Sequence, residues 1–285
     1  MADIITNVLY KFANLLDSSI WISFLAIALI TPLLFTTQTT EIYEVPKMFF
    51  VYIFAILILF LTVIKFILNK KIEVPNNLVV IAFAIFVFAQ GVSTIFSIDK
   101  FTSVFGYPTR LNGGLISQIA YLAIFSSAFI NLNWQKAEKL LIAIMISAFA
   151  VAIWGIPSHF GRDPSCWVLT GKLISSCWQK EFDPTLRIFS TLGQPNWLAS
   201  YLVLIIPLAI SFLLFFKQKG AKILFFAISV ILFWALILTG SRAGIIGIVT
   251  ALLVFLFFLG VKVIKTNLKL LSFLGAFFII LGLLF

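Results

Sequence analysis

Charged residues are scarce in this sequence and make up only 11% of its 285 positions. A soluble domain usually carries about a quarter charged residues. Hydrophobic residues account for 62% of the chain, and 33 of them are phenylalanines. A water-soluble fold of this length could not bury so much apolar surface. The composition therefore indicates a polytopic membrane protein.

Several residue types that carry enzyme chemistry are also scarce. The chain has one histidine, His159, and two cysteines, Cys166 and Cys177, which are too few for a structural zinc site. It has no glycine-rich phosphate loop followed by Lys and Ser/Thr, and no paired carboxylates or Ser/His/Asp arrangement stands out. Few charges fall inside the apolar runs, which disfavours an ion-coupled transporter with buried carboxylates. We expect no cofactor and no metal.

Nine apolar runs have lengths typical of helices that cross a bilayer. They cover residues 20–36, 46–66, 77–96, 113–131, 139–156, 196–216, 222–239, 243–260 and 268–285. A hydrocarbon core of about 30 Å needs around 20 helical residues. A single helix over residues 222–260 would span about 58 Å, so the polar Thr239–Arg242 stretch is interpreted as the turn of a hairpin. The sequence predicts an all-α, polytopic transmembrane bundle of about nine spans, forming one domain over residues 1–285.

The distribution of basic residues predicts the orientation of these spans. One set of alternate loops holds 12 of the 20 Lys and Arg residues in short segments, and the other set holds 8 over longer ones. Basic residues favour the inside, so the amino terminus is predicted inside, with the loops near 40, 100, 160–195 and 240 outside. The net charge of +10 is explained by this topology and by contact with anionic membrane lipids, and no nucleic acid is expected as a partner.

The two cysteines both fall in the predicted outside loop, residues 157–195. Because the outside is an oxidising compartment, we expect a disulfide between Cys166 and Cys177. Closing so short a loop stabilises a fold by about 2–3 kcal/mol in the chain-entropy picture. The alternative is two unpaired thiols.

Arg242 is the most informative single residue, because span counting places it at the outer mouth of the predicted hairpin. A charge close to the membrane interior is a functional hypothesis by default, and a guanidinium suits bidentate capture of phosphate oxygens. The alternative is an arginine that anchors a helix at the headgroups. Gly240 and Gly244 flank it at GxxxG spacing, which favours close approach of a neighbouring helix.

A second polar segment, residues 193–196, precedes another apolar run. Its Pro and Asn can start a helix whose first-turn N–H groups would bind an anion. Gln194 and Asn196 add donors, and Arg187 lies just upstream. This cationic, amide-rich surface would face Arg242 if the two spans pack together. The alternative is an ordinary loop-to-helix cap.

A third outside loop, residues 106–114, contains Arg110 among Gly, Pro and Asn residues. This content is typical of a turn. The loop is either a plain connector or another cationic contact for a diphosphate or a sugar. Lys47, at the start of the second span, is open to the same two interpretations.

Two of these motifs at their spacing resemble the O-antigen ligase/polymerase family of multispan bacterial envelope proteins. They are FSTLGQPNWLASYLVLIIPLAI, residues 189–210, and LTGSRAG, residues 238–244. Weaker likeness is found in PLLF and EIYEVPK, within residues 32–47, and in SIDKFTSVFGYPTRLNGG, residues 97–114. The resemblance covers residues 32–247.

The resemblance implies an inverting, metal-independent glycosyltransferase on the outer face of the bacterial inner membrane. It would pass a glycan from undecaprenyl diphosphate to lipid A–core, as in lipopolysaccharide, to a growing polysaccharide, or to a protein hydroxyl. Arg242 would be the catalytic residue that holds the donor's diphosphate. The residues expected to bind substrate with it are Arg187, Gln194, Asn196, Arg110 and Ser241.

A different class of function is kept open, namely a non-enzymatic flippase or transporter of a lipid-linked glycan. It explains the cationic loops equally well, and Pro207 would kink its span as membrane helices do near cavities.

The apolar run at residues 268–285 closes the sequence without a polar tail. We therefore expect an amino-terminal portion of a longer protein that continues into a large outside loop. In the family that this chain resembles, such a loop carries further Arg and His residues.

Overall fold

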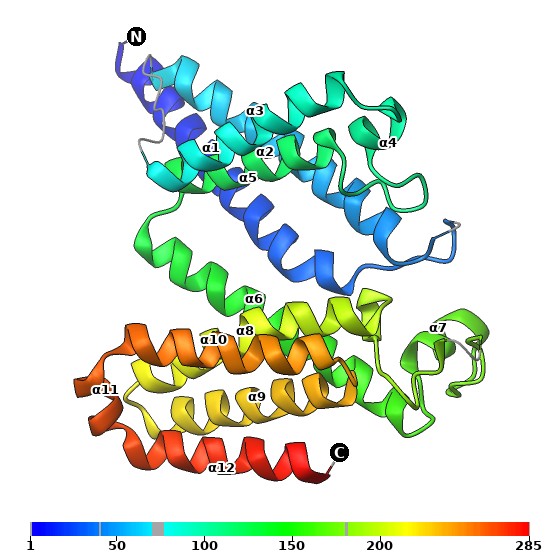
Figure 1. Cartoon of the computed structure of the whole chain (residues 1–285). Coiled ribbons are helices and arrows are strands. Elements are labelled where there is room, and N and C mark those ends of the chain that lie inside the picture. Colours follow the sequence, from blue (N-terminus) through cyan, green and yellow to red (C-terminus); the bar gives the residue numbers. More distant parts are fainter. Residues whose placement is uncertain (1, 40, 70–76, 180–181, 285) are drawn as a thin grey trace. The chain divides into compact units, whose positions relative to one another are not determined.

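The structure is a computed structural model that describes residues 2–39, 41–69, 77–179 and 182–284, with side chains from residue 11 onward. Within these ranges the chain is helical and contains no β-strand (Figure 1). Seven helical segments are long and apolar enough to cross a membrane. The predicted class, a helical membrane protein, is confirmed at this level.

The helices follow the predicted apolar runs closely. The long ones are α1 (Ala2–Ile30, continued by the 3-10 turn η1, Thr31–Leu33), α2 (Glu44–Asn69), α3 (Leu78–Ile95), α6 (Trp134–His159), α8 (Pro195–Phe215), α9 (Lys219–Leu238) and α10 (Arg242–Leu259). Two shorter apolar helices, α5 (Leu115–Asn131) and α12 (Leu268–Leu284), occupy the remaining two runs. Short helices α4 (Lys100–Phe105), α7 (Pro164–Thr170), η3 (Ser190–Leu192) and α11 (Val261–Thr266) lie in the connections.

The first helix differs from the sequence-based boundary. A span was expected at 20–36 after a separate amphipathic lead-in, whereas α1 runs continuously from Ala2 to Ile30. No proline or glycine occurs within these residues to interrupt the backbone hydrogen bonds. Pro32 then lies in the 3-10 turn that follows the helix.

The chain divides into two compact units, residues 1–143 and 144–285. Helix α6 carries the chain from the first unit into the second. The expectation of one domain over residues 1–285 stays a prediction.

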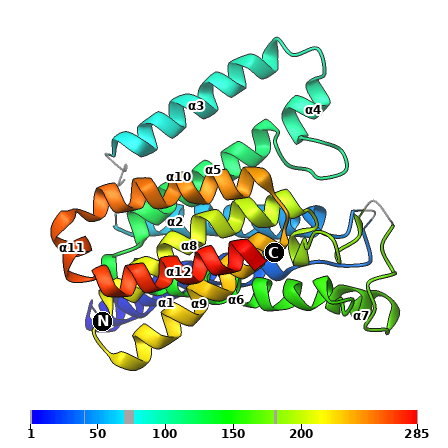
Figure 2. The ribbon, with the colours of Figure 1, turned by 60° about the horizontal axis from the view of Figure 1, so that its bottom comes forward.

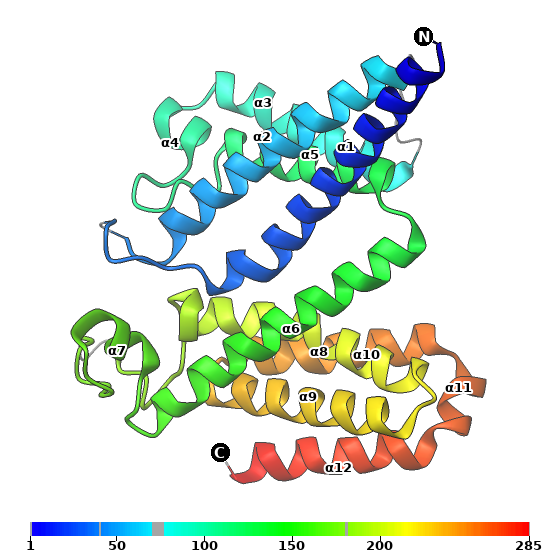
Figure 3. The same ribbon diagram turned by 180° about the vertical axis from the view of Figure 1, so that it is seen from behind.

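In the first unit, α2 packs against both α1 and α5, and α3 packs against α5. Figure 3 shows α1 and α2 running side by side. Their contact buries Ile20, Phe24 and Ile58 in one apolar cluster. At one end of α2 the ammonium of Lys65 donates to Asp17 at 2.7 Å and to the Asn131 amide oxygen at 3.1 Å. These bonds join α1, α2 and α5.

In the second unit, α8 packs against both α9 and α10, and α12 packs against α9 (Figures 1 and 2). Gly244 of α10 lies so close to α8 that a Cβ built on it would be 2.8 Å from the Cβ of Ala199. The close helix approach predicted from the small residues around Arg242 is confirmed at this contact.

Residues 222–260 form two helices, and the predicted hairpin is confirmed. Helix α9 ends at Leu238 and α10 begins at Arg242. Gly240 makes the turn with a φ of +58°, a conformation that glycine adopts without the Cβ clash of other residues. The Ser241 hydroxyl caps α10 by accepting the N–H of Gly244 at 3.2 Å.

Candidate functional site

The two motifs predicted to face each other are joined by Arg187. Its Nε donates to the carbonyl of Thr239 at 2.9 Å, and its Nη2 donates to the Asn196 amide oxygen at 2.9 Å. The next residue, Ile188, donates its backbone N–H to the carbonyl of Leu238 at 3.1 Å. The segment before α8 is thereby tied to the end of α9, and the Asn196 amide helps to orient a guanidinium.

The turn at Gly240 is shaped to receive the Arg187 side chain. A Cβ at Gly240 would lie 3.2 Å from Arg187 Cγ and 3.4 Å from its Nε. Glycine therefore serves two needs here, a positive φ and room for the arginine stem. The tight turn at Gly240 was predicted from the sequence, whereas the need for room beside the Arg187 side chain was not.

Arg242 follows this turn as the first residue of α10, and its side chain is exposed. Its guanidinium makes no hydrogen bond or ion pair with any residue that the structure describes. The amino end of a helix carries partial positive charge, so a cation there is unfavourable unless an anion accompanies it. The geometry is therefore suited to binding an anion.

Ser241 has a structural role, the capping of α10, that was not predicted from the sequence. Its side chain is 2% exposed and its hydroxyl oxygen caps α10. Its predicted part in binding substrate stays a prediction, and its established contact fixes the direction of the helix that carries Arg242.

An apolar groove of about 610 Å³ extends from this turn between α9, α10 and α12. Gly240, Ser241 and Arg242 line one part of it, and the rest is lined by apolar side chains and glycines. Phe233 of α9 and Phe278 of α12 stack along it with ring centroids 3.9 Å apart. The groove thus presents hydrocarbon surface next to a cation.

This groove was not predicted from the sequence. It forms because α12 packs against α9, and such a pairing is not contained in the hydrophobicity of either helix. The one available signal was the spacing of Gly275 and Gly282 by seven residues, which places both on one helix face. Both glycines line the groove.

A smaller pocket of about 190 Å³ is lined by Arg187 and its neighbours. Its polar lining consists of Asp183, Arg187, Gln194 and Asn196, and its apolar lining of Phe182, Leu186, Phe189 and Pro195. Gln194, predicted to bind substrate, is half-buried here and immediately precedes α8. Three of the predicted binding residues, Arg187, Gln194 and Asn196, therefore share one pocket.

The loop before Arg187 is held by a disulfide between Cys166 and Cys177. Close by, the buried carboxylate of Asp163 accepts the indole N–H of Trp178 at 2.6 Å and the N–H of Ser165 at 2.8 Å. The Trp178 ring packs edge-on against Phe189 with centroids 5.2 Å apart. The disulfide loop therefore supports the segment that carries Arg187.

Replacing both cysteines by serine is expected to lower the free energy of unfolding by about 2–3 kcal/mol, because an 11-residue separation is no longer closed. Thermal unfolding of the purified native and double-serine proteins, with and without reductant, measures the effect. Reductant should lower the melting temperature of the native protein only. Equal melting temperatures for both proteins without reductant would contradict a stabilising disulfide.

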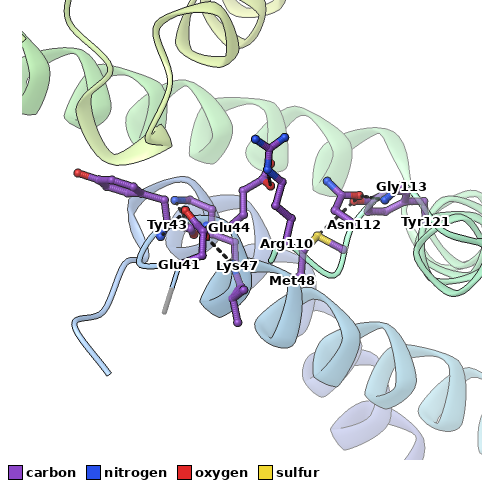
Figure 4. Close-up of polar contacts among 10 residues, drawn as sticks. Glu41, Tyr43, Glu44, Lys47, Met48, Arg110, Asn112, Gly113 and Tyr121 are labelled. Atoms are coloured by element: carbon purple, nitrogen blue, oxygen red, sulfur yellow. Dashed lines mark hydrogen bonds and ion pairs between the residues drawn. The ribbon is translucent and has the colours of Figure 1, made fainter. Parts of the chain in front are cut away.

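Arg110 lies in the first unit, where its Nε is 3.4 Å from a carboxylate oxygen of Glu44 (Figure 4). Nearby, Tyr121 donates its hydroxyl to the Asn112 amide oxygen at 3.0 Å, and Lys47 donates to the Tyr43 carbonyl at 3.2 Å. The contact between Arg110 and Glu44 brings together the two weaker motifs, residues 41–47 and 97–114. The predicted part of Arg110 in holding substrate stays a prediction, and its charge has a carboxylate partner.

Five of the predicted site residues gather around the α9–α10 turn and the start of α8, namely Arg187, Gln194, Asn196, Ser241 and Arg242. Within the described ranges, no three His, Cys, Asp or Glu side chains are grouped as metal ligands would be. The arrangement offers two guanidinium groups, side-chain amides and an adjoining apolar groove. No model of a known protein family, no curated protein and no solved structure matches this chain.

Proposed function

We propose that this protein is a membrane glycosyltransferase of the O-antigen ligase/polymerase type. It would transfer a glycan from undecaprenyl diphosphate to a saccharide, lipid A–core or protein hydroxyl. The observation that carries the proposal is the apolar groove with Arg242 at its border. A lipid diphosphate combines a long hydrocarbon chain with a strongly anionic head, and this groove offers a surface for each part.

The chemistry follows from the charges at the turn. When the acceptor oxygen bonds to the anomeric carbon, the bond from that carbon to the diphosphate breaks and negative charge develops on the leaving diphosphate. The guanidinium of Arg242 and the amino end of α10 would stabilise this charge. Arg187, held by Thr239 and Asn196, retains further N–H groups for the same anion because a guanidinium has five.

The proposal includes the topology that the loops predict. The nine apolar helices would each cross the bacterial inner membrane, with the amino terminus inside and the α9–α10 turn outside. Helices α5 and α12 have 17 residues each, about 25 Å of helix. They are shorter than a core of about 30 Å and would need local thinning of the bilayer or interfacial flanking residues.

A flippase or transporter of lipid-linked glycan is the second candidate, and it is favoured by Pro207 inside α8, because proline is a residue that kinks helices. The same groove would hold the lipid without any reaction. The two candidates differ in one product, a new glycosidic bond.

The test uses the purified protein in proteoliposomes that contain an undecaprenyl-diphosphate-linked oligosaccharide and a lipid A–core, oligosaccharide or peptide acceptor. Mass spectrometry of the acceptor should show an added glycan, and released undecaprenyl diphosphate should appear in equal amount. Movement of the lipid-linked glycan between leaflets, with no glycosylated acceptor, would overturn the transferase and support the transporter.

A further inference from the structure

We infer that Asp183 is the proton acceptor for the acceptor hydroxyl, and that the pocket beside Arg187 receives the reacting end of the acceptor. The inference rests on the proposed function and deepens it by assigning the base. It concerns the pocket of about 190 Å³ lined by Asp183, Arg187, Gln194 and Asn196, none of which lines the apolar groove.

Asp183 and Arg187 belong to one turn of the chain. The Asp183 carbonyl accepts the backbone N–H groups of Leu186 at 3.2 Å and Arg187 at 3.3 Å. The carboxylate oxygen Oδ1 accepts both the N–H and the hydroxyl of Thr185, at 2.9 and 2.8 Å. The carboxylate is therefore held in a fixed direction, in the same turn of the chain as Arg187.

The second carboxylate oxygen, Oδ2, makes no bond with the described residues. Among the described residues, no ion pair joins the Asp183 carboxylate to Arg187. The Nε and Nη2 of Arg187 donate instead to Thr239 and Asn196. A carboxylate that is oriented but not neutralised can accept a proton.

The rest of the pocket fits a hydroxylated ligand. The side-chain amides of Gln194 and Asn196 line it and can bind sugar hydroxyls, while Phe182 and Leu186 supply apolar surface. Its volume of about 190 Å³ has room for one sugar-sized group and not for a polyisoprenoid chain.

Few other groups in this unit could take the proton. The unit has three acidic residues, Asp163, Glu181 and Asp183. Asp163 is 1% exposed and both of its oxygens accept hydrogen bonds. Glu181 lies outside the described residues. The described lining of the pocket contains Asp183 as its carboxylate and does not include His159.

The hydroxyl oxygen of the acceptor forms a bond to the anomeric carbon, and its proton passes to the Asp183 carboxylate. The bond from the anomeric carbon to the diphosphate oxygen breaks, and its electron pair leaves with the diphosphate beside Arg242. Inversion at the anomeric carbon follows because the two oxygens lie on opposite sides of it.

The test compares Asp183→Asn, which keeps the shape and removes the base, with Glu181→Gln, which removes the same charge two positions earlier. Transfer is measured with the undecaprenyl-diphosphate-linked oligosaccharide in proteoliposomes, and binding of undecaprenyl diphosphate is measured separately. Asp183→Asn should lower kcat about 100-fold or more, with unchanged binding of the lipid. Glu181→Gln should keep native kcat, and Asp183→Glu should restore part of it.

The outcomes separate the two proposals. A transfer rate of Asp183→Asn within about threefold of the native rate would overturn the role of Asp183. A loss of lipid binding in this variant would also overturn it, because the residue would then have a structural role. Absence of transfer by the native protein, despite lipid binding, would overturn the proposed transferase itself.

Discussion

Replacing Arg242 by alanine is expected to lower glycan transfer by about 100-fold or more while the protein keeps its native melting temperature. The magnitude is that of removing one donor to a developing negative charge. The stability is expected to persist because the side chain is exposed and makes no hydrogen bond or ion pair in the described part of the chain. Transfer assays in proteoliposomes and thermal unfolding of the same preparations measure both quantities.

Arg162→Ala is the matched control for this variant. Arg162 is also exposed and lies in the same unit, in the connection between α6 and α7. It lines neither the groove nor the pocket beside Arg187, so its loss removes one positive charge and should leave transfer unchanged. Arg242→Lys keeps the charge without the planar fork and should recover only part of the rate. Equal transfer by the Arg242→Ala and native proteins would contradict the assigned role.

Gly244→Ala is expected to lower the free energy of unfolding by about 1–3 kcal/mol, the range of an overpacked contact. The added Cβ would lie 2.8 Å from Ala199 Cβ, 3.1 Å from Leu236 Cδ1 and 3.3 Å from Ser241 Cβ. The atom on α8 is a Cβ, which moves only with its backbone, so α8 and α10 must separate. Because Arg242 begins α10, transfer should fall as well. Thermal unfolding and the transfer assay measure these effects.

Gly247→Ala provides the comparison on the same helix. A Cβ there would meet Val203 at 3.5 Å, an ordinary contact, and alanine favours a helix over glycine by about 1 kcal/mol. This variant should be as stable as the native protein or slightly more so. In Gly244→Ala, adding Ala199→Gly should recover part of the stability by reopening the space. Equal stability of the two Gly→Ala variants would show that α8 and α10 are not in close contact at Gly244.

The sequence predicted those parts of the fold that depend on local chemistry. The apolar runs became helices, and the break at Gly240 was predictable because the combined length exceeded a bilayer and the turn residues were polar. The sequence predicted that residues 193–196 would face the α9–α10 turn if their two helices packed together. The Arg187 bonds to Thr239 and Asn196 meet that condition.

Features that depend on distant pairings were not predictable. The groove forms only because α12 packs beside α9. The periodicity of apolar residues in a helix does not specify which other helix it will contact. The partner of Arg110, Glu44, is 66 positions away in the sequence. The buried Asp163 and its bond from Trp178 were also missed, because a carboxylate in a polar loop gives no sign of being buried.

The central claim is that the groove between α9, α10 and α12 binds a lipid diphosphate through Arg242. Its most direct test is native mass spectrometry of the purified protein with undecaprenyl diphosphate or undecaprenol, using the native, Arg242→Ala and Arg162→Ala proteins. We expect the native and Arg162→Ala proteins to retain the diphosphate lipid, with Arg242→Ala binding it at least tenfold more weakly, a loss of about 1.4 kcal/mol. All three should bind undecaprenol weakly. Equal binding of the diphosphate lipid by the native and Arg242→Ala proteins would contradict the account.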